Sequence, residues 1–380
     1  MRIVHLGYSH RNDDIRIFRK ECCSLVQQGH EVYYITSDKN SNYINENIDA
    51  GVHIIILRRT AESNKIKRYY EYLKALTNRA LELDADVYHI HETGLLPIWK
   101  SLKRNNKLVV YDSHEDTPRQ MRPQLEKQRG KVVGVLFEKI LELYEDYVVK
   151  KIDFVITATP YIKSRFSRIK REVVCINNYP IINDLEYHEE VKKTKKNSIC
   201  FTGGISDVSG IRETVKALNG LLSIRLKLAG PLDDKLKTEL EKYPGWKQTD
   251  YYGVVNHSEV ADICRESYAG IILYQPLPNH VNAQPNKMFE YMLMGLPIIC
   301  SDFPIWKKMI EKKQCGLCVN PQSPKHIAMA IEKLYQDSEL AYRMGQNGRK
   351  AILAEYNWGK EEVKLFEVYK FLERKKNDKE

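Results

Sequence analysis

The sequence predicts an α/β protein made of two doubly wound, Rossmann-like domains. Three observations support this fold class: the chain length, the alternation of strand-like and helical segments in each half, and a polar interruption between the halves. The chain has 380 residues, and at about 100 to 200 residues per domain this length corresponds to two domains. We expect a first domain over residues 1–180, a linker over 181–197, a second domain over 198–358 and a final helix over 359–380.

In the first half, short β-branched runs alternate with helical stretches. The first helix is expected over residues 15–28, where apolar residues recur at helical spacing and Gly29 supplies a C-terminal cap. The strand-like runs are RIVHLGY, EVYYIT, VHIIIL, DVYHIH, KLVVYD, FVITAT and EVVCIN. Apolar strands that alternate with helices on short connections predict a mostly parallel sheet covered on both faces.

The alternation stops between residues 179 and 197, where Pro180, Asn183 and the run KKTKK indicate a linker. It resumes with the strand-like runs SICFTGG, RLKLAG, AGIILY and LPIICSD, separated by helical stretches near 211–220, 258–266 and 286–294. Beyond about residue 324 only helical periodicity remains. The second half therefore predicts another α/β domain. We expect a ligand to bind where the carboxyl ends of the strands of the two sheets line a cleft.

Composition and hydropathy exclude several classes of protein. A charged fraction of 29% with 14 Pro and 19 Gly is far from the composition of disordered or collagen-like chains. The longest apolar stretches, such as residues 54–57, are much shorter than the roughly 20 residues that a membrane span needs. The N-terminus meets polar residues before a signal peptide could form, which predicts a cytoplasmic location.

The eight cysteines lie mostly within apolar runs, which favours small buried side chains over a disulfide framework. Cys315 and Cys318 form a CxxC motif, but a tetrahedral zinc site needs a second pair of ligands and none is nearby. We therefore expect no disulfides and no bound metal.

The formal net charge is +10, and the densest basic part of the chain is residues 58–79. This region carries seven basic residues against two acidic ones, together with Tyr69, Tyr70 and Tyr72. Clustered Lys and Arg with interfacial Tyr suit an anionic lipid surface, to which each cation near the surface contributes about 1 kcal/mol. A solvated helix face explains the same pattern equally well. A basic nucleic-acid-binding protein is a weaker alternative.

The strongest chemical signal is the stretch HVNAQPNKMFEYMLMGLPIICSD at residues 280–302. Pro285 indicates the start of a helix, and the Gly-Leu-Pro that follows Met294 indicates its end. We therefore expect a short helix between two buried strands. Lys287 and Glu290 share one face of this helix, with Cβ atoms roughly 5 to 6 Å apart. A cation beside the free N–H groups of a helix start suits a diphosphate, and a carboxylate one turn deeper can accept hydrogen bonds from a ribose diol. The pattern indicates a nucleotide-diphosphate site, with an exposed ion pair as the alternative.

With these residues, the chain resembles glycosyltransferase family 4, the retaining nucleotide-sugar transferases of GT-B fold. An ordered set of motifs along nearly the whole chain carries the resemblance: DDIRIFRKECCSLVQQGHEVYYIT, ADVYHIHETGLLP, VVYDSHEDTPRQM, FTGGISDVSGIRETVKAL, LAGPL, YYGVV, PNKMFEYMLMGLPII and YNWGKEEVKLFEVYKFL. The resemblance implies an acceptor-binding first domain, a donor-binding second domain and a last helix that returns to the first domain. It also implies a UDP- or GDP-linked sugar as donor, no cofactor, and retention of configuration.

The family motif is a Glu followed eight positions later by a second Glu, which holds the donor ribose. Glu290 matches the second Glu, whereas Asn282 stands at the first position. The family also favours a basic residue before the Gly of its first C-domain loop, where this chain has Ser209 before Gly210. Arg212 could supply that charge, with a surface arginine as the alternative. The other donor-binding residues implied by the motifs are Gly203, Gly204, Gly230, Val254, Asn286 and Lys287.

In the first half, polar residues follow two strand-like runs and should lie at the carboxyl edge of the sheet. His91 ends one of these runs, and the resemblance places a His beside the transferred sugar; a structural His bonded to the backbone is the alternative. The next run is followed by a similar cluster, for which acceptor recognition is expected: His114, Glu115 and Asp116.

Two charged residues near the first helix are further candidates for substrate contact. Asp14 and Arg16 follow the loop after the first strand and could orient either substrate. The alternative for the acidic residues here is an N-terminal helix cap by Asp13 or Asp14.

Breaking a sugar–phosphate bond builds negative charge on the leaving diphosphate, which positive electrostatics must stabilise. We expect the catalytic set to be His91, Glu290, Lys287 and Arg212. Asp84 and Asp86 spell the DxD of metal-dependent transferases of another fold, but they precede an apolar strand and should lie at the opposite edge of the sheet. We therefore expect metal-independent transfer, in which the leaving phosphate takes the proton of the acceptor.

The expected partners are a nucleotide-sugar donor, a glycan or lipid-linked acceptor of cell-surface polysaccharide or glycolipid synthesis, and an anionic membrane contacted through residues 58–79. The last partner would place the protein on the inner face of the plasma membrane. A nucleotide-sugar epimerase of the same fold is the nearest alternative. An inactive relative is a further one, for which Asn282 is the argument.

Overall fold

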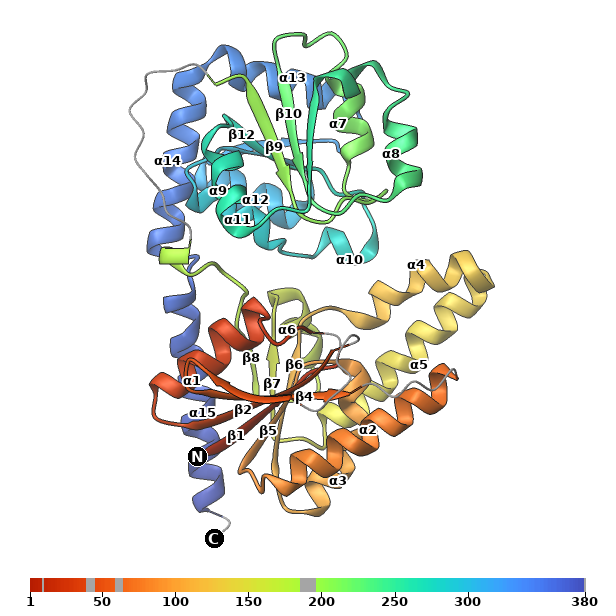
Figure 1. Cartoon of the computed structure of the whole chain (residues 1–380), viewed down its shortest axis with the longest axis vertical. Coiled ribbons are helices and arrows are strands. Elements are labelled where there is room, and N and C mark those ends of the chain that lie inside the picture. Colours follow the sequence, from red (N-terminus) through yellow and green to blue (C-terminus); the bar gives the residue numbers. More distant parts are fainter. Residues whose placement is uncertain (9, 39–44, 59–63, 185–195, 379–380) are drawn as a thin grey trace. The chain divides into compact units, whose positions relative to one another are not determined.

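A computed structural model describes residues 1–8, 10–38, 45–58, 64–184 and 196–378. The chain divides into two compact units, Met1–Asn178 with Gly359–Glu380, and Tyr179–Trp358. Each unit is a parallel-stranded sheet covered by helices (Figure 1), which confirms the predicted class of two Rossmann-like α/β domains. Most of the predicted linker, residues 185–195, lies outside the described residues.

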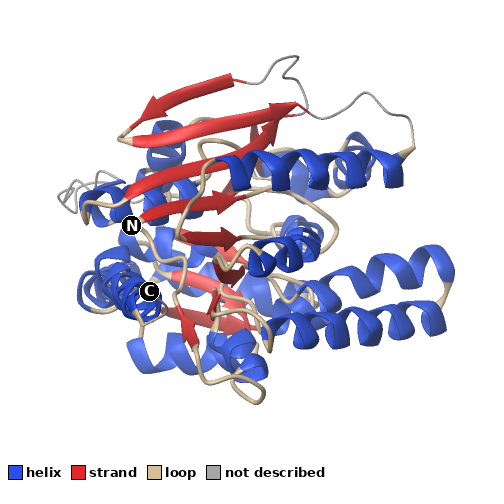
Figure 2. Cartoon of the chain, turned by 90° about the horizontal axis from the view of Figure 1, so that it is seen from below, coloured by secondary structure: helices blue, strands red, loops and turns tan. Residues whose placement is uncertain are grey.

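The first unit is built on an eight-stranded sheet, seen from below in Figure 2, with the order β3-β4-β2-β1-β5-β6-β7-β8. Its strands are β1 (Arg2–Leu6), β2 (Glu31–Asp38), β3 (Asn45–Asp49), β4 (Val52–Arg58), β5 (Val87–Ile90), β6 (Leu108–Ser113), β7 (Phe154–Thr157) and β8 (Val173–Cys175). Only β3, at the edge, runs antiparallel to its neighbour. Its sequence NENID is polar, so the apolar pattern that predicted the other strands did not reveal it.

The helices of the first unit are η1 (Ile15–Cys22), α1 (Cys23–Gln27), α2 (Lys65–Glu82), η2 (Thr93–Ile98), α3 (Trp99–Arg104), α4 (Thr117–Arg129), α5 (Lys131–Val149), α6 (Pro160–Phe166) and α15 (Trp358–Asn377). The expected first helix begins as a π-helix, η1, in which the N–H groups of Phe18 and Arg19 both reach the carbonyl of Asp14. Three charged side chains of η1 are buried: Arg16, Lys20 and Glu21.

The second unit has an all-parallel sheet with the order β11-β10-β9-β12-β13-β14. Its strands are β9 (Ser198–Thr202), β10 (Arg225–Ala229), β11 (Thr249–Gly253), β12 (Ala269–Ile272), β13 (Ile298–Ser301) and β14 (Gly316–Val319). Its helices are η3 (Ile182–Asp184), α7 (Ile211–Ala217), α8 (Asp234–Leu240), η4 (Pro244–Gln248), α9 (His257–Arg265), α10 (Pro278–Val281), α11 (Asn286–Leu293), α12 (Pro304–Lys313), α13 (Pro324–Gln336) and α14 (Ser338–Ala354). On β14, the thiol of Cys318 lies 3.7 Å from that of Cys300.

The sheet interiors explain the continuous apolar runs of the sequence. The central strands β6, β9, β12 and β13 are buried at every position, because helices cover both faces. Polar side chains are therefore accessible where the parallel strands end, at the carboxyl edge of each sheet. No helix within the described part of the chain is long and apolar enough to cross a membrane.

Candidate active site

In the second unit, α11 brings Lys287 to the carboxyl end of β9. One face of α11 is anchored in the core by residues such as Met288 and Tyr291, and the hydroxyl of Tyr291 accepts a hydrogen bond of 2.8 Å from the backbone N–H of Thr202. The Lys287 ammonium lies 4.1 Å from the ring centroid of Phe201. It also lies so near Gly203 that a Cβ atom there would be 2.7 Å from Nζ. The helix therefore holds a cation against a backbone that carries no side chain.

The surroundings of Lys287 weaken its hold on a proton. Burial lowers the pKa of Lys287 to about 8, although the negative charge of Glu290, one turn along α11, raises it. The free N–H groups of the first turn of α11 lie at the same end of the helix. An anion bound there would interact with the ammonium of Lys287 in place of the water that burial excludes. This is the arrangement expected of a phosphate site.

Two glycines allow the backbones of the loops after β9 and β10 to approach each other closely. Gly203 follows β9 with φ +118°, and Gly230 follows β10 with φ +138°. A Cβ on Gly230 would lie 2.0 Å from the carbonyl oxygen of Gly203. Gly204, in contrast, has open space where its side chain would be. These two loops therefore offer backbone groups beside the Lys287 ammonium.

The segment between α10 and α11 is held in place by Trp306, whose indole N–H donates a hydrogen bond of 2.6 Å to the carbonyl of Ala283. Asn282 lies in this segment and Asn286 begins α11. The segment also carries Gln284, whose amide oxygen is buried without a hydrogen-bond partner. We did not single out Gln284 from the sequence. Its position directly before Pro285 and the Lys287 helix is the signal that could have identified it.

Two of the predicted donor residues are less well placed. The guanidinium of Arg212 donates hydrogen bonds of 2.6 and 2.9 Å to the two carboxylate oxygens of Glu239, and another of 2.9 Å to Asp207. These carboxylates already neutralise the charge expected to reach the diphosphate, so the structure favours the alternative of a surface arginine. The side chain of Val254 is 78% exposed and is not held against the second sheet.

In the first unit, His91 directly follows β5, yet its side chain is only 1% exposed. Its Nε2 lies 2.8 Å from Nδ1 of His5, and its Nδ1 lies 3.2 Å from Nε2 of His114. Burial lowers the pKa of His91 to about 4, although a hydrogen bond with Asp112 raises it, so the ring is neutral at pH 7. The predicted contact of His91 with the sugar is therefore corrected: both ring nitrogens are engaged and the ring positions its neighbours.

Arg16 and Asp112 form a buried ion pair beneath this edge. The guanidinium donates bonds of 3.0 and 2.9 Å to Asp112 and one of 3.0 Å to the carbonyl of Ile176. Burial would raise the pKa of Asp112, but Arg16 and His114 outweigh it and hold the pKa well below its usual range. Asp14 accepts 2.9 Å bonds from the N–H groups of Arg16 and Ile17, which is the helix-capping role that the sequence left open. The expected substrate contact of Arg16 is thus replaced by a structural pair.

Two imidazoles at this edge remain partly accessible, those of His114 and His10, with 15% and 23% of their side chains exposed. Nε2 of His114 lies 2.8 Å from Asp112 Oδ2, and the His114 ring lies 5.1 Å from that of His10. Burial lowers the pKa of His10, but the carboxylates of Asp14 and Glu92 outweigh it and raise the pKa overall. We did not single out His10 or Glu92 from the sequence. Both follow the carboxyl ends of strands, the same signal that identified His91.

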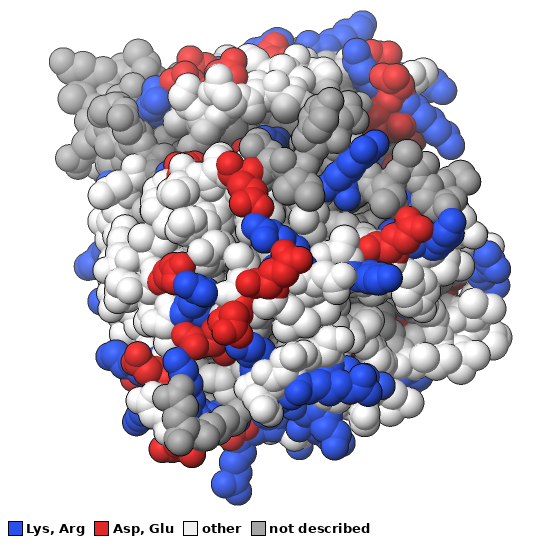
Figure 3. All heavy atoms as spheres, turned by 60° about the horizontal axis from the view of Figure 1, so that its bottom comes forward, with Lys and Arg blue, Asp and Glu red and all other residues white. Residues whose placement is uncertain are grey.

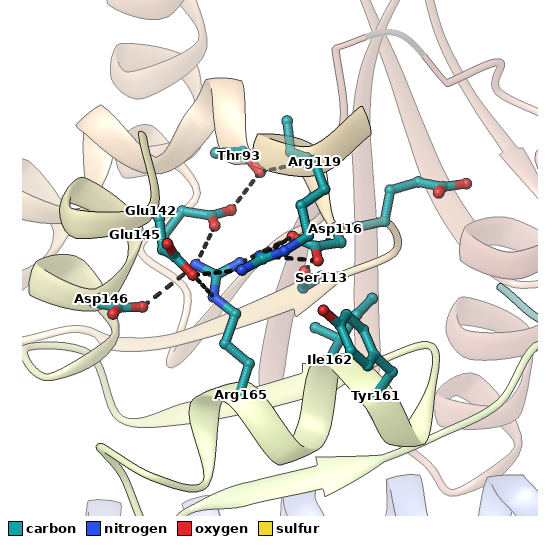
Figure 4. Close-up of polar contacts among 12 residues, drawn as sticks. Thr93, Ser113, Asp116, Arg119, Glu142, Glu145, Asp146, Tyr161, Ile162 and Arg165 are labelled. Atoms are coloured by element: carbon teal, nitrogen blue, oxygen red, sulfur yellow. Dashed lines mark hydrogen bonds and ion pairs between the residues drawn. The ribbon is translucent and has the colours of Figure 1, made fainter. Parts of the chain in front are cut away.

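A charged cluster anchors the base of the α4–α5 hairpin (Figure 4), formed by Thr93, Asp116, Arg119, Glu142, Glu145, Asp146 and Arg165. Asp116 is 7% exposed and accepts two bonds of 3.0 Å from Arg119 and one of 3.3 Å from Arg165. The predicted role of Asp116 in acceptor recognition is therefore corrected to that of an anchor. Glu115, its neighbour, is exposed.

The DxD pair lies at the opposite edge of the sheet, directly before β5. The carboxylate of Asp84 pairs with Lys107 at 2.5 Å. That of Asp86 accepts a 2.8 Å bond from the N–H of Arg2 and pairs with Lys376 at 2.9 Å. Each carboxylate thus has a structural partner of its own.

Two family descriptions match the chain in succession. "Glycosyltransferase Family 4" matches residues 19–178 and "Glycosyl transferases group 1" matches residues 183–351. The chain belongs to glycosyltransferase family 4. It is therefore a glycosyltransferase with the GT-B fold.

Solved glycosyltransferase structures share this fold over nearly the whole chain. Sucrose-phosphate synthase from Thermosynechococcus elongatus has a TM-score of 0.80 at 15% identity, over 98% of this chain and 99% of that one. HepE of Anabaena in complex with UDP and glucose has a TM-score of 0.73 at 11% identity, over 97% and 99%. A trehalose-6-phosphate synthase studied for glycosyl transfer with retention has a TM-score of 0.69 at 13% identity, over 97% and 99%. At these identities the likeness concerns the fold alone. No curated protein sequence matches the chain.

Proposed function

We propose that this glycosyltransferase moves a sugar from a nucleotide-diphosphate sugar to a glycan or lipid-linked acceptor. The observation that carries the proposal is Lys287, whose ammonium is held against the side-chain-free backbone at Gly203 and has a pKa lowered to about 8 by burial. A buried cation is costly unless an anion compensates it. The diphosphate of a donor is such an anion, and we assign the ribose of the donor to Glu290, whose carboxylate can accept hydrogen bonds from the two hydroxyl groups.

We propose UDP or GDP as the nucleotide and retention as the stereochemical course. The similar HepE structure holds UDP and glucose, and the similar trehalose-6-phosphate synthase was studied for transfer with retention. In a retaining reaction of this kind the leaving phosphate takes the proton of the acceptor. The protein then needs to stabilise charge on the leaving group and to fix the positions of both substrates.

We also propose that donor cleavage needs no metal ion. Lys287 and the N-terminus of α11 supply positive electrostatics to the diphosphate. Asp84 and Asp86, the DxD pair, are paired with Lys107 and Lys376 at the other edge of the first sheet. A chelator should therefore leave donor cleavage unchanged.

For the acceptor, we propose the edge of the first unit around His114, with His10 and Glu115 beside it. His114 is hydrogen-bonded to Asp112 and retains some exposed surface. An imidazole with one nitrogen fixed by a carboxylate can orient a hydroxyl group. Asp14 and Arg16 hold this edge in place: Asp14 caps the helix η1, and Arg16 forms hydrogen bonds with Asp112.

A calorimetric screen of UDP, GDP and ADP tests the donor assignment. We expect one of the uridine or guanosine nucleotides to bind and its affinity to fall in Lys287→Ala. Lys307→Ala, an exposed lysine on the next helix α12, is the matched control and should bind normally. Equal binding in both variants, or no binding by the unmodified protein, would remove the proposal. Product analysis separates transfer from epimerisation, which needs no added acceptor.

A nucleic-acid-binding role receives less support. On the face shown in Figure 3, acidic and basic side chains are interspersed rather than gathered into one basic stripe. Binding to a nucleic acid would depend steeply on salt and would not explain why Lys287 is buried beside Glu290.

We further propose that the enzyme is cytoplasmic and attaches to the inner face of the plasma membrane. Within the predicted basic region, residues 59–63 lie outside the described residues. The described part forms the start of α2, where Ile66 is 70% and Tyr70 64% exposed, next to exposed Lys65 and Lys67. Tyr72, in contrast, is buried. The outward face of α2 thus combines apolar and basic side chains.

The neighbouring helix α5 supports the same proposal more strongly. A stripe at helical spacing is exposed along it: Val132, Leu136, Ile140, Leu143 and Tyr147. The five acidic side chains of the α4–α5 hairpin are all paired with arginines: Glu126, Glu138, Glu142, Glu145 and Asp146. The exposed charges that remain are basic, at Lys127, Arg129, Lys131, Lys150 and Lys151. An exposed apolar stripe bordered by cations suits an anionic lipid surface.

Flotation with liposomes tests this attachment. We expect binding to vesicles that contain phosphatidylserine at low salt, and a loss of at least about tenfold in Leu136→Glu/Ile140→Glu. Leu222→Glu, an 85% exposed leucine of the second unit, is the control and should float normally. Absence of flotation by the unmodified protein at low salt would refute the attachment.

A further inference from the structure

Behind the carboxyl edge of the first sheet, three side chains that the proposed reaction does not use meet in the interior. His5 on β1 and His89 on β5 are register partners on adjacent strands, and their ring centroids lie 4.6 Å apart. Glu21 reaches them from the π-helix η1, which covers this face of the sheet. All three side chains have no exposed surface.

Four polar atoms of this cluster are buried without a hydrogen-bond partner among the described residues. They are Nε2 of His5, Nε2 of His89 and both carboxylate oxygens of Glu21. Buried polar groups in folded proteins are nearly always satisfied, because leaving them unpaired is costly. Within the described part of the chain, three of these atoms also have no ion-pair contact other than the one within the cluster, whereas Glu21 Oε1 lies 3.2 Å from Arg16 Nε. The four atoms together form a candidate set of ligands for a cation.

The other ring nitrogens are held in the way that metal-ligating histidines require. Nδ1 of His89 lies 2.9 Å from the hydroxyl of Tyr369, and Nδ1 of His5 lies 2.8 Å from Nε2 of His91. In metal sites the nitrogen that does not bind the metal is usually hydrogen-bonded, which fixes the ring and its tautomer. Both imidazoles therefore have a fixed orientation, and His89 has its Nε2 3.9 Å from Glu21 Oε2.

The distances suit a small cation. The candidate ligand atoms of His5, Glu21, His89 and His91 all lie within 4.8 Å of one another, and the described residues offer one other such group, His91, Asp112 and His114. Glu21 Oε2 lies 3.9 Å from Nε2 of His89, whereas two ligands of a tetrahedral zinc ion stand about 3.4 Å apart. The His89–Glu21 pair needs an inward shift of about half an ångström to reach this spacing, and the widest pair of the group needs up to about 1.4 Å.

The charges nearby are compatible with a bound cation. Arg16 Nε lies 3.2 Å from Glu21 Oε1, but the same guanidinium is paired with Asp112. Burial and the nearby Asp112 raise the pKa of Glu21 well above its usual range. With the Glu21 proton displaced by the cation, the two carboxylates exceed the single arginine charge by one. The second group is a weaker candidate, because Asp112 is already held by Arg16 and both ring nitrogens of His91 are hydrogen-bonded.

We propose that His5 Nε2, His89 Nε2 and the Glu21 carboxylate bind a divalent transition-metal ion, with zinc as the ion that two imidazoles and a carboxylate suit best. The ion joins β1, β5 and η1 and lies in the first unit, apart from the donor helix α11. Coordination through Nε2 keeps the His5 proton on Nδ1, which donates to His91 Nε2. The His91 proton is then on Nδ1 and faces Asp112 and His114, so the ion fixes the tautomers that lead to the proposed acceptor edge.

The metal content of the full-length protein tests the proposal directly. The protein is purified with a tag that contains no histidine and analysed by inductively coupled plasma mass spectrometry. We expect about one zinc, or another divalent transition metal, per chain. Protein unfolded with a chelator and refolded with Co²⁺ should show the visible absorption bands of cobalt bound by nitrogen and oxygen ligands. Less than about 0.1 metal per chain together with no cobalt spectrum would overturn the proposal.

Single substitutions locate the ion. Glu21→Gln and His89→Gln keep the approximate size of each side chain and should lower metal content at least about tenfold, in protein whose circular dichroism is unchanged. His257→Gln, on the helix α9 of the second unit, is the matched control and should keep its metal. Full metal content in both cluster variants would overturn the site. If neither variant folds, the metal content and cobalt spectrum of the unmodified protein decide.

Discussion

Replacing Lys287 with methionine separates a donor-binding role of this lysine from a structural one. Methionine keeps an unbranched side chain of similar length and removes the charge. Burial lowers the pKa of Lys287 from 10.5 to about 8, and each tenfold change in proton affinity corresponds to about 1.4 kcal/mol. Keeping the ammonium charged at pH 7 therefore costs the folded protein about 3 kcal/mol, part of which the contact with the Phe201 ring offsets.

We therefore expect Lys287→Met to raise the free energy of unfolding by about 1 to 3 kcal/mol at pH 7. Each kcal/mol should raise the melting temperature by about 2 to 4 °C. The sign follows from the lowered pKa: the cost is fully present below the folded-state pKa of about 8 and disappears by the unfolded value of 10.5. The gain should therefore shrink as the pH rises through this window. Differential scanning calorimetry at pH 7 and pH 10 measures both effects.

The same variant should lose affinity for the nucleotide. A hydrogen bond to a charged group contributes about 1.5 to 3 kcal/mol, so the dissociation constant should rise about 10- to 100-fold. Isothermal titration calorimetry with the nucleotide found in the screen measures this change. Lys307→Met, an exposed lysine on α12, should change neither stability nor affinity. A Lys287→Met protein that is less stable and binds every nucleotide normally would refute the reasoning.

Four further results are expected. Glu290→Gln should reduce the rate of transfer by at least about 100-fold, because charged hydrogen bonds to the ribose are lost. The control Glu311→Gln on α12 should not reduce this rate. Near-normal turnover of Glu290→Gln would count against the ribose contact. Nucleotide affinity should fall about tenfold between pH 7 and pH 9, because Lys287, with a pKa of about 8, loses its proton in this range; a flat titration would contradict this. Asp112→Asn should lower the free energy of unfolding by about 1.5 to 3 kcal/mol in urea titrations, because the buried Arg16 would lose its charged hydrogen bonds to Asp112 and keep the 3.2 Å contact with Glu21; a loss below about 1 kcal/mol would disagree. Arg212→Ala should lower kcat/KM less than about tenfold, because Glu239 already holds the guanidinium; a loss above 100-fold would restore Arg212 as a phosphate ligand.

The sequence predicted what local patterns determine. Buried parallel strands read as continuous apolar runs, so the central strands of both sheets were identified. The strands β3, β11 and β14, which are more exposed, were not. The pairing of Lys287 and Glu290 follows from their spacing on a short helix, which the flanking Pro285 and the glycine after Met294 delimit. These features depend on neighbours within one or two helical turns.

Features that depend on distant partners escaped prediction. Arg16 pairs with Asp112, 96 residues along the chain, and Arg212 pairs with Glu239, 27 residues along. The sequence does not show these partners, so both arginines were predicted to bind substrates. His91 and His114 both follow strands at the same edge, yet only the packing of His5 against His91 decides which ring is buried. The helical spacing of residues 15–28 predicted a helix but not that it begins as the π-helix η1, whose wide turn depends on backbone hydrogen bonds to Asp14.

The central claim is that the helix α11 holds the diphosphate and ribose of the donor. A crystal structure of the protein with the nucleotide identified by calorimetry tests it most directly. We expect the diphosphate within hydrogen-bond distance of Lys287 Nζ and the Gly203 loop, and the ribose hydroxyls on the carboxylate of Glu290. A nucleotide bound elsewhere, with Lys287 and Glu290 unchanged, would contradict the account.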